Sequence, residues 1–286
     1  MTAGPGLTTE QPLRGGMDAR YAPVRVGDTV RRVAGTGSAF VRDLLLHLET
    51  VGFDGAPRFL GVDEQGREIL SWVDGDVPLP PYPAWSMTDR AMADLGGLIR
   101  RFHEATATFR IEHDDWSTQW GDPTAASGFV CHNDLFPENV VFRDGRVVAL
   151  IDFAMASPGR PLWDLAIAGE IWGPLGDPAR RDPAAAHFDG IRRLGILANA
   201  YGLDPGRAAE LIDVLVEERA HSHANIRAEI ADGNPAWTRD WAAGGGDERA
   251  AADDAWIADQ REALLRALGV EWTRARPGTS RQETTT

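Results

Sequence analysis

Lysine is absent from this sequence: all 29 basic residues are arginines, and they stand against 43 acidic residues for a formal net charge of −14. This balance argues against nucleic acids and anionic membranes as partners, because both bind basic patches. It is compatible with a cationic small-molecule substrate. It is also compatible with acidic residues that serve solubility alone, which is the commoner explanation.

Cysteine is nearly absent as well, since Cys131 is the only one. A single cysteine forms no disulfide within the chain and leaves no cysteine-based metal site. Long apolar runs are also missing, and stretches such as residues 147–151 are far shorter than the roughly 20 residues that span a bilayer. The Gly-, Pro- and Thr-rich segment 1–12 has no apolar signal core, so we expect a disordered lead-in to a cytoplasmic protein. The polar segment 277–286 is predicted to be a disordered tail.

The chain of 286 residues is long enough for one large or two smaller domains with apolar cores. Up to residue 75 its pattern predicts strands around one helix, which begins with Ser38 as its N-cap and carries apolar residues at helical spacing up to Leu48. Gly75 and the proline-rich run 78–81 then indicate a linker. The predicted strands of this first part cover residues 21–26, 29–33, 58–62 and 68–73.

Residues 76–276 read as mostly helical. Ser86 is the expected cap of a first long helix. Short strands are predicted at 128–131, 140–142 and 147–152, with a turn at Asp144-Gly145 between the last two.

The most informative segment is His132-Asn133-Asp134, followed by Asn139 and, beyond the predicted hairpin, by Asp152. Phosphoryl transfer needs a carboxylate near the acceptor hydroxyl and oxygen ligands for magnesium on the nucleotide phosphates. One loop that carries Asp134 and Asn139, beside a strand that ends at Asp152, can supply these groups within one pocket. Each motif alone could be a turn, because Asp and Asn are common turn residues. Their order and separation favour the phosphoryl-transfer interpretation.

This segment resembles the catalytic and metal-binding loops of the aminoglycoside phosphotransferase and choline kinase superfamily, which shares its fold with protein kinases. The resemblance implies that Asp134 is the catalytic base and that His132 orients the catalytic loop. It also implies that Asn139 and Asp152 bind Mg²⁺. In the similar stretch 158–166, it gives Asp164 a structural role in supporting that loop. The implied fold is α+β and bilobal, with a small β-rich N-lobe over residues 13–75 and a larger helical C-lobe over residues 76–276.

The stretches 59–63 and 66–75 are similar to the last N-lobe strands and the hinge between the lobes. By this resemblance, the backbone of Ser71, Trp72 and Val73 would receive the adenine edge of ATP or GTP. The short glycine-containing stretch 13–16 is the candidate for a loop that covers the nucleotide.

Members of this superfamily usually anchor the phosphates with a lysine on the third strand, paired with a glutamate on the next helix. Here the position expected to hold the glutamate is Val41. Strand alternation puts Arg32 on the same face as Val30, so Arg32 is the expected anchor, with Arg31 on the opposite face and Arg25 as the next candidate. A planar guanidinium grips phosphate oxygens in a bidentate manner, and we expect it to need a glutamate partner less than a lysine does.

These residues predict a kinase that transfers a phosphate from ATP or GTP to a hydroxyl of a small acceptor. Aminoglycoside-like antibiotics, amino alcohols and sugars all qualify, and antibiotic resistance is one possible outcome of such a reaction. The alternative is a nucleotide-binding pseudokinase that has lost its chemistry, which the missing Lys–Glu pair motivates. Five acidic residues could line a site for a cationic acceptor, although a solvated surface is the commoner role for such residues: Glu217, Glu218, Asp240, Asp253 and Asp254.

Other candidates favour structural interpretations. His221 and His223 are two positions apart on a predicted helix, so they do not face each other as a metal pair would. His103 is expected to be a packed helix residue. Cys131 is expected to be a small buried residue at the end of a strand.

Overall fold

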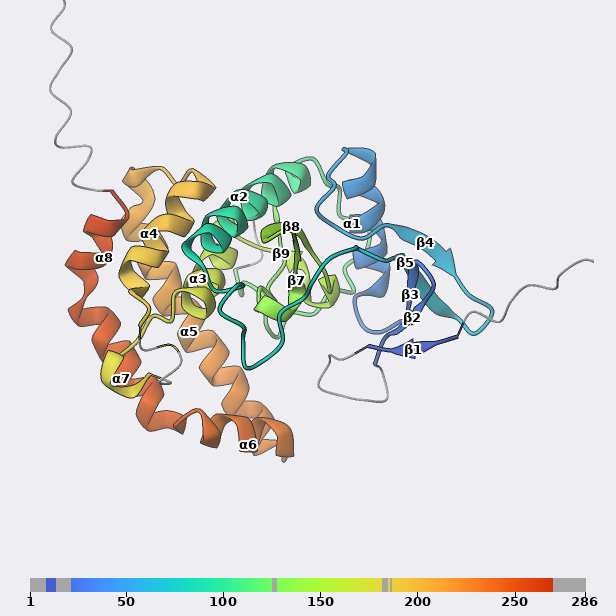
Figure 1. Ribbon diagram of the computed structural model, residues 1–286. Helices are drawn as coiled ribbons and strands as arrows, with labels where there is room; N and C mark the ends of the chain where they lie inside the picture. Colours follow the sequence, from blue (N-terminus) through green and yellow to red (C-terminus); the bar gives the residue numbers. More distant parts are fainter. Residues whose placement is uncertain (1–8, 14–21, 125–127, 182–184, 186, 270–286) are drawn as a thin grey trace, which may run out of the picture.

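The computed structural model describes residues 9–13, 22–124, 128–181, 185 and 187–269. It shows a small β-rich lobe and a larger helical lobe, with short antiparallel strand pairs between them (Figure 1). The expected bilobal α+β architecture is therefore confirmed. The stretches 14–16 and 277–286, expected to be a nucleotide-covering loop and a tail, lie outside the described residues.

The small lobe is a five-stranded antiparallel sheet in the order β1-β2-β3-β5-β4. Two residues expected in the disordered lead-in, Gln11 and Pro12, form its edge strand and pair with β2. The strands are β1 (Gln11–Pro12), β2 (Val24–Val26), β3 (Thr29–Val33), β4 (Phe59–Val62) and β5 (Arg67–Ser71).

The register between β3 and β5 decides which side chains face the other lobe. Val30 lies opposite Leu70, and Arg32 lies opposite Glu68. Leu70 belongs to the apolar core, and the partly buried Val30 packs against it. Because alternate residues of a strand share a face, Arg32 and Glu68 lie on that same inner side.

Helix α1 (Ser38–Thr50) follows β3 and presents an apolar stripe in which every residue is 1% exposed or less. Ser38 is its first residue and not its cap, which corrects the expectation. The carboxylate of Asp115 accepts hydrogen bonds from Ala39 N and Phe40 N at 3.2 and 3.0 Å. A side chain far along the chain thus supplies the acceptor that an N-terminal turn needs. The stripe comprises Phe40, Val41, Leu44, Leu45 and Leu48.

The helical lobe is built around α2 (Asp89–Thr106), which packs along α4, and α3 (Pro161–Trp172), which packs along α5. The cap of α2 is Thr88, whose hydroxyl accepts from Ala91 N at 3.1 Å. Ser86, the expected cap, is buried, and its hydroxyl donates to Pro83 O. The remaining helices are α4 (Gly190–Tyr201), α5 (Ala208–Ala231), α6 (Pro235–Ala243), α7 (Gly246–Asp259) and α8 (Arg261–Ala267).

Two small antiparallel pairs lie where the lobes meet. Strand β6 (Val130–Cys131) pairs with β9 (Ser157–Pro158), and β7 (Val140–Arg143) pairs with β8 (Arg146–Leu150). The linker contacts this region, because Asp76 and Phe142 exchange two backbone hydrogen bonds of 2.7 and 2.8 Å. Gly75 must be glycine there, since its φ is +146° and a Cβ would lie 2.3 Å from Phe142 O. Among the described residues, no helix is long and apolar enough to cross a bilayer.

Candidate active site

The backbone of the loop between β6 and β7 is hydrogen-bonded to Asp164, which is fully buried at the start of α3. Its carboxylate accepts from the backbone N–H groups of His132 and Asn133 at 2.8 and 2.9 Å. Asn133 has a left-handed backbone with φ 64°, and its amide donates to Met155 O at 2.8 Å. The expected supporting role of Asp164 is consistent with this geometry.

His103 on α2 contacts Asp164, and the sequence did not indicate this contact. Its Nε2 lies 3.0 Å from Asp164, and its Nδ1 lies 3.0 Å from the Tyr201 hydroxyl. His103 is a buried helix residue, as expected, but it also fixes the carboxylate that holds the loop. Cys131 lies close to both, and its thiol donates to Arg160 O. Burial raises the pKa of that thiol. Each of the three side chains has a hydrogen-bond partner within the protein, so we interpret the group as structural.

His132 connects the two segments that carry the acidic residues. The ring is fully buried, its Nδ1 accepts from Asp134 N at 3.3 Å, and its Nε2 donates to Ile151 O at 3.1 Å. Burial lowers the pKa of His132, which favours the neutral ring that accepts at one nitrogen and donates at the other. His132 is therefore placed to position Asp134 and the residue before Asp152, and not to contact a substrate.

Asp134 and Asn139 contact each other directly. The Asn139 amide nitrogen donates to Asp134 Oδ2 at 2.7 Å and to Asp134 O at 3.0 Å. Asn139 ends the 3₁₀ turn Pro137–Asn139, and its backbone oxygen accepts from Ile151 N at 2.9 Å. Because the amide nitrogen is engaged, the amide oxygen Oδ1 is left without a hydrogen-bond donor among the described residues. That oxygen is the atom a magnesium ion would bind.

Asp152 follows β8 in a left-handed conformation, with φ 59° and a side chain that is 51% exposed. The strand was predicted to run to this residue, but it ends at Leu150 because Asp152 caps the turn Phe153–Met155. Burial of Asp134, and next the charge of Asp152, raise the pKa of Asp134 to about 7. Two carboxylates that repel each other beside an amide oxygen are the kind of hard oxygen set that fits Mg²⁺.

Arg32 and Arg31 point to opposite faces of the sheet. Arg32 Nη1 lies 3.7 Å from Asp152 Oδ1, on the side of the acidic cluster. Arg31 Nη1 donates to Thr29 Oγ1 at 2.6 Å, and its Nε lies 3.7 Å from Asp63. The alternation expected from the sequence places Arg32, and not Arg31, toward the catalytic loop.

Arg32 does have a carboxylate partner, which the sequence did not indicate. Arg32 Nε donates to Glu68 Oε2 at 2.7 Å, and Glu68 is only 4% exposed. Val41, where the superfamily usually has its glutamate, lies in the core with 1% exposure. The partner comes from a neighbouring strand, so only the register between β3 and β5 reveals it.

The three expected hinge residues differ in what their backbone can offer a nucleobase. Ser71 N donates to Arg58 O at 2.9 Å, and Trp72 N donates to Asp28 O at 2.8 Å. Val73 N makes no such bond among the described residues, so it is the hinge donor left for a ligand. The Arg25 guanidinium stacks 3.9 Å above the Trp72 ring.

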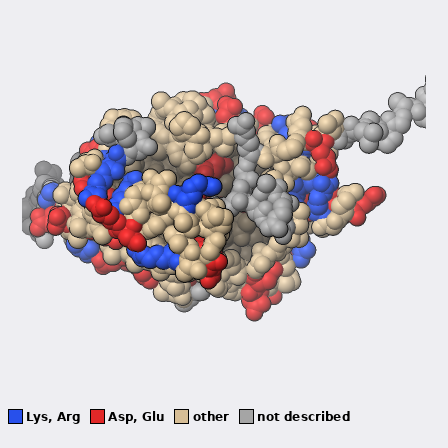
Figure 2. Space-filling view, turned by 90° about the horizontal axis from the view of Figure 1, so that it is seen from below, with Lys and Arg blue, Asp and Glu red and all other residues tan. Residues whose placement is uncertain are grey.

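The five acidic candidates do not gather in one open acidic surface. Glu217 pairs with Arg160 at 3.0 Å, and Asp254 pairs with Arg219 at 2.8 Å. Glu218 is buried, and burial and then the nearby Glu170 raise its pKa. Asp253 is also buried, while Asp240 pairs with Arg239. On the face shown in Figure 2, acidic and basic side chains lie interspersed.

The two histidines on α5 contact different elements. His221 Nε2 lies 2.9 Å from Gln119 O, whereas the His223 ring packs against Trp241. Their side chains therefore lie against different parts of the fold, as expected for positions two apart on a helix.

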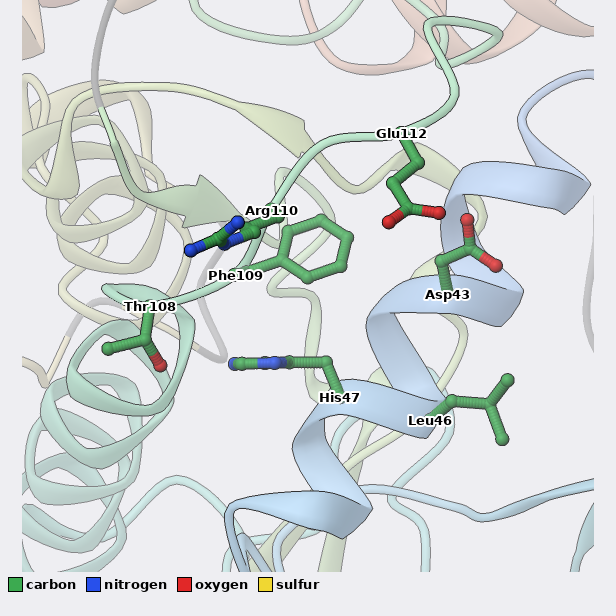
Figure 3. Close-up of a pocket in the computed structure, with 7 residues that line it drawn as sticks. All are labelled: Asp43, Leu46, His47, Thr108, Phe109, Arg110 and Glu112. Carbon is green, nitrogen blue, oxygen red and sulfur yellow. The ribbon is translucent and has the colours of Figure 1, made fainter.

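A shallow pocket also lies beside α1 (Figure 3). The ring centroids of His47 and Phe109 are 5.3 Å apart across it. His47 Nε2 already bonds to Ala105 O, and no catalytic-loop residue lines this pocket. The lining residues are Asp43, Leu46, His47, Thr108, Phe109, Arg110 and Glu112.

Comparison with known proteins is consistent with this geometry. The family model of the phosphotransferase enzyme family matches residues 122–211, which contain the catalytic loop, Asp152 and Asp164. The trifolitoxin immunity protein of Rhizobium leguminosarum bv. trifolii is 32% identical over 274 residues, covering 92% of this chain and 100% of that protein.

Solved structures share the fold at lower sequence identity. A choline/ethanolamine kinase family protein from Mesorhizobium loti has a TM-score of 0.63 with 18% identity, covering 92% of each chain. An amicoumacin kinase in complex with AMP-PNP, Ca²⁺ and Ami has a TM-score of 0.57 with 14% identity, covering 90% of this chain and 88% of that one. With a full-length relative, a matching family model and a shared kinase-like fold, this chain belongs to the phosphotransferase enzyme family.

Proposed function

We propose that this protein is a kinase that transfers the γ-phosphate of ATP or GTP to a hydroxyl group of a small molecule. The observation that carries the proposal is one cluster at the junction of the lobes, in which Asp134 contacts Asn139 and lies near Asp152, and Asp152 in turn lies 3.7 Å from Arg32. Phosphoryl transfer is catalysed mainly by positioning and electrostatic stabilisation. The cluster contains a base, two oxygen ligands and a cation for that purpose.

Asp134 is the proposed general base. A pKa of about 7 lets its carboxylate accept a proton from the acceptor hydroxyl near neutral pH. His132 and Asp164 hold the loop backbone in place around it. Asn139 Oδ1 and the Asp152 carboxylate would hold Mg²⁺, which neutralises charge on the nucleotide phosphates when bound.

Arg32 is the proposed phosphate anchor, and the hinge around Ser71, Trp72 and Val73 is the proposed site for the nucleobase. Val73 N supports this, because it is a donor without a partner among the described residues. A pseudokinase is the alternative, since the usual lysine is missing. The Arg32–Glu68 pair speaks against it, because a cation and its carboxylate partner are both present in another arrangement.

The proposed acceptor class is a toxin or antibiotic that carries a free hydroxyl. Two relatives support it by name: one is an immunity protein for trifolitoxin, and the other is a kinase for amicoumacin. Phosphorylation would add negative charge and bulk to such a molecule and so abolish its binding to its target. Amino alcohols and sugars belong in the same test panel.

The direct test is nucleotide-dependent phosphorylation across a panel of toxins, antibiotics, amino alcohols and sugars. We expect ADP or GDP release with one acceptor class, and a loss of about 10²- to 10⁴-fold in turnover for Asp134→Asn. Nucleotide binding should persist in this variant. An Asp134→Asn enzyme that keeps most of its activity would refute the assignment of the base.

Asp152 allows a separate test of the metal site. We expect Asp152→Ala to weaken nucleotide binding in the presence of Mg²⁺ and to leave it unchanged in excess chelator, because the carboxylate acts through the metal. Calorimetric titration under both conditions measures the difference. Equal weakening in both would show a general defect of the site instead.

A further inference from the structure

We propose that Glu68 is the positioning residue of the phosphate anchor, so that a carboxylate on the sheet does what a helix-borne glutamate usually does. Arg32 Nε donates to Glu68 Oε2 at 2.7 Å. Glu68 is 4% exposed, and Arg32 is the partner that the structure gives its side chain. This inference rests on the proposed function, because it concerns how that site holds its nucleotide.

The sheet fixes the pair in space. Arg32 and Glu68 are direct partners in the antiparallel ladder of β3 and β5. Directly opposed residues in such a ladder have their Cβ atoms about 5 Å apart. The pair is therefore built into the sheet and does not depend on the position of a helix.

The nitrogen atoms of the Arg32 guanidinium have different partners. Nε donates to Glu68, while Nη1 faces Asp152 at 3.7 Å. The hydrogen bond to Glu68 thus directs the Nη end of Arg32 toward the proposed binding site of the phosphates and the metal. It also holds Arg32 beyond close contact with Asp152. Without Glu68, the guanidinium would be free to close onto Asp152 and compete with Mg²⁺ for that carboxylate.

Helix α1 takes no part in this arrangement. Val41 is buried in the core, and the N-terminal turn of α1 is held by Asp115. The carboxylate that binds Arg32 at hydrogen-bond distance therefore comes from β5 and not from α1.

The test measures binding of Mg·ATP and Mg·GTP to the wild type, Glu68→Gln, Arg32→Ala and the double variant. We expect Glu68→Gln to raise the nucleotide dissociation constant about 10- to 100-fold, which corresponds to the loss of a charge-assisted bond. The acceptor KM should not change. In the double variant the loss should equal that of Arg32→Ala, because Glu68 acts only through Arg32. Glu68→Asp should recover part of the affinity.

Two exposed or outward-facing positions serve as matched controls. Glu64→Gln removes a carboxylate from the exposed turn before β5, and Arg31→Ala removes a guanidinium from the outer face. Both should bind nucleotide like the wild type. Melting temperatures establish that each variant is folded, and Glu68→Asp carries the comparison if Glu68→Gln is unstable.

The sign of the change is decisive. If Glu68 is merely a neighbouring negative charge, its removal makes the site more positive and nucleotide binding tightens. Tighter or unchanged nucleotide binding in Glu68→Gln overturns the proposal. So does a double variant that binds nucleotide more weakly than Arg32→Ala. In either case, nucleotide binding by the wild type still supports the kinase assignment. A wild type that binds neither nucleotide overturns both.

Discussion

Burial and the charge of Asp152 act on Asp134 in the same direction, since both disfavour its ionised form and raise its pKa to about 7. In the unfolded chain an aspartate has a pKa of about 3.9. Between these values the folded protein binds more protons than the unfolded chain. The free energy of unfolding therefore falls as pH rises from about 4 to 7 through this residue. Ionisation of the Asp134 carboxyl group therefore lowers the stability of the fold.

Asp134→Asn should reverse that penalty. We expect its free energy of unfolding to exceed that of the wild type at pH 8 by on the order of 2 kcal/mol, with little difference at pH 4. The value is discounted from the full pKa shift because the side chain is only partly sheltered from water. Urea unfolding at both pH values, with chelator present, measures it. A difference that is the same at pH 4 and pH 8 would exclude the ionisation of Asp134 as its cause.

Individual residues also show how far the sequence could be interpreted. Asp134, Asn139 and Asp152 were singled out because their order and separation resemble a known catalytic motif, and the structure brings them together. Glu68 could not be found in this way. Its proposed role depends on which residue of β5 lies opposite Arg32, and that pairing is seen only in the folded sheet. His103 was missed for a similar reason, since its partner Asp164 lies 61 positions away.

Among the elements, α1 shows best how a local signal can mislead. Ser38 is a favourable N-cap residue, yet the helix starts at it and its hydroxyl accepts from Gly35 N instead. The acceptors for the first helical turn come from Asp115, in the segment after α2. The apolar stripe of α1 was predicted correctly because helical periodicity is a local property, whereas this cap is a tertiary contact.

Removal of this distant cap should loosen α1. We expect Asp115→Ala to lower the free energy of unfolding by about 1 kcal/mol, as loss of a capping side chain commonly does. Amide exchange at Ala39 and Phe40 should speed up with it. Asp114→Ala is the matched control, because that neighbouring carboxylate is exposed. If both variants behave alike, Asp115 does not hold the helix.

For the whole molecule, the large net charge of −14 is weak evidence for a cationic acceptor. The acidic residues that were candidates for a cationic site are largely buried or paired with arginines. Paired charges present a weaker field to a ligand than the formal total implies. The molecule therefore offers acidic side chains in a mixed surface, and its acceptor preference has to be tested directly.

The salt dependence of the acceptor KM distinguishes a polycationic acceptor from a neutral one. A polycationic acceptor should bind more weakly as ionic strength rises, because the screening length falls to about 10 Å at 0.1 M salt. We expect a several-fold rise in KM between low and moderate salt for such a molecule. The nucleotide concentration is kept saturating so that the anchor does not contribute. A constant KM would assign the site to a neutral acceptor.

The arginine in place of the usual lysine also affects how this protein can be detected. Reagents that acylate an amine in a nucleotide site need a nucleophilic nitrogen, and a guanidinium stays protonated at every usable pH. At the proposed anchor site, nucleotide analogues with acylating groups would therefore leave Arg32 unmodified. Arginine-directed dicarbonyl reagents are the suitable probes, with protection by nucleotide as their signature. Proteome surveys that recognise kinases by a labelled lysine would pass over this molecule.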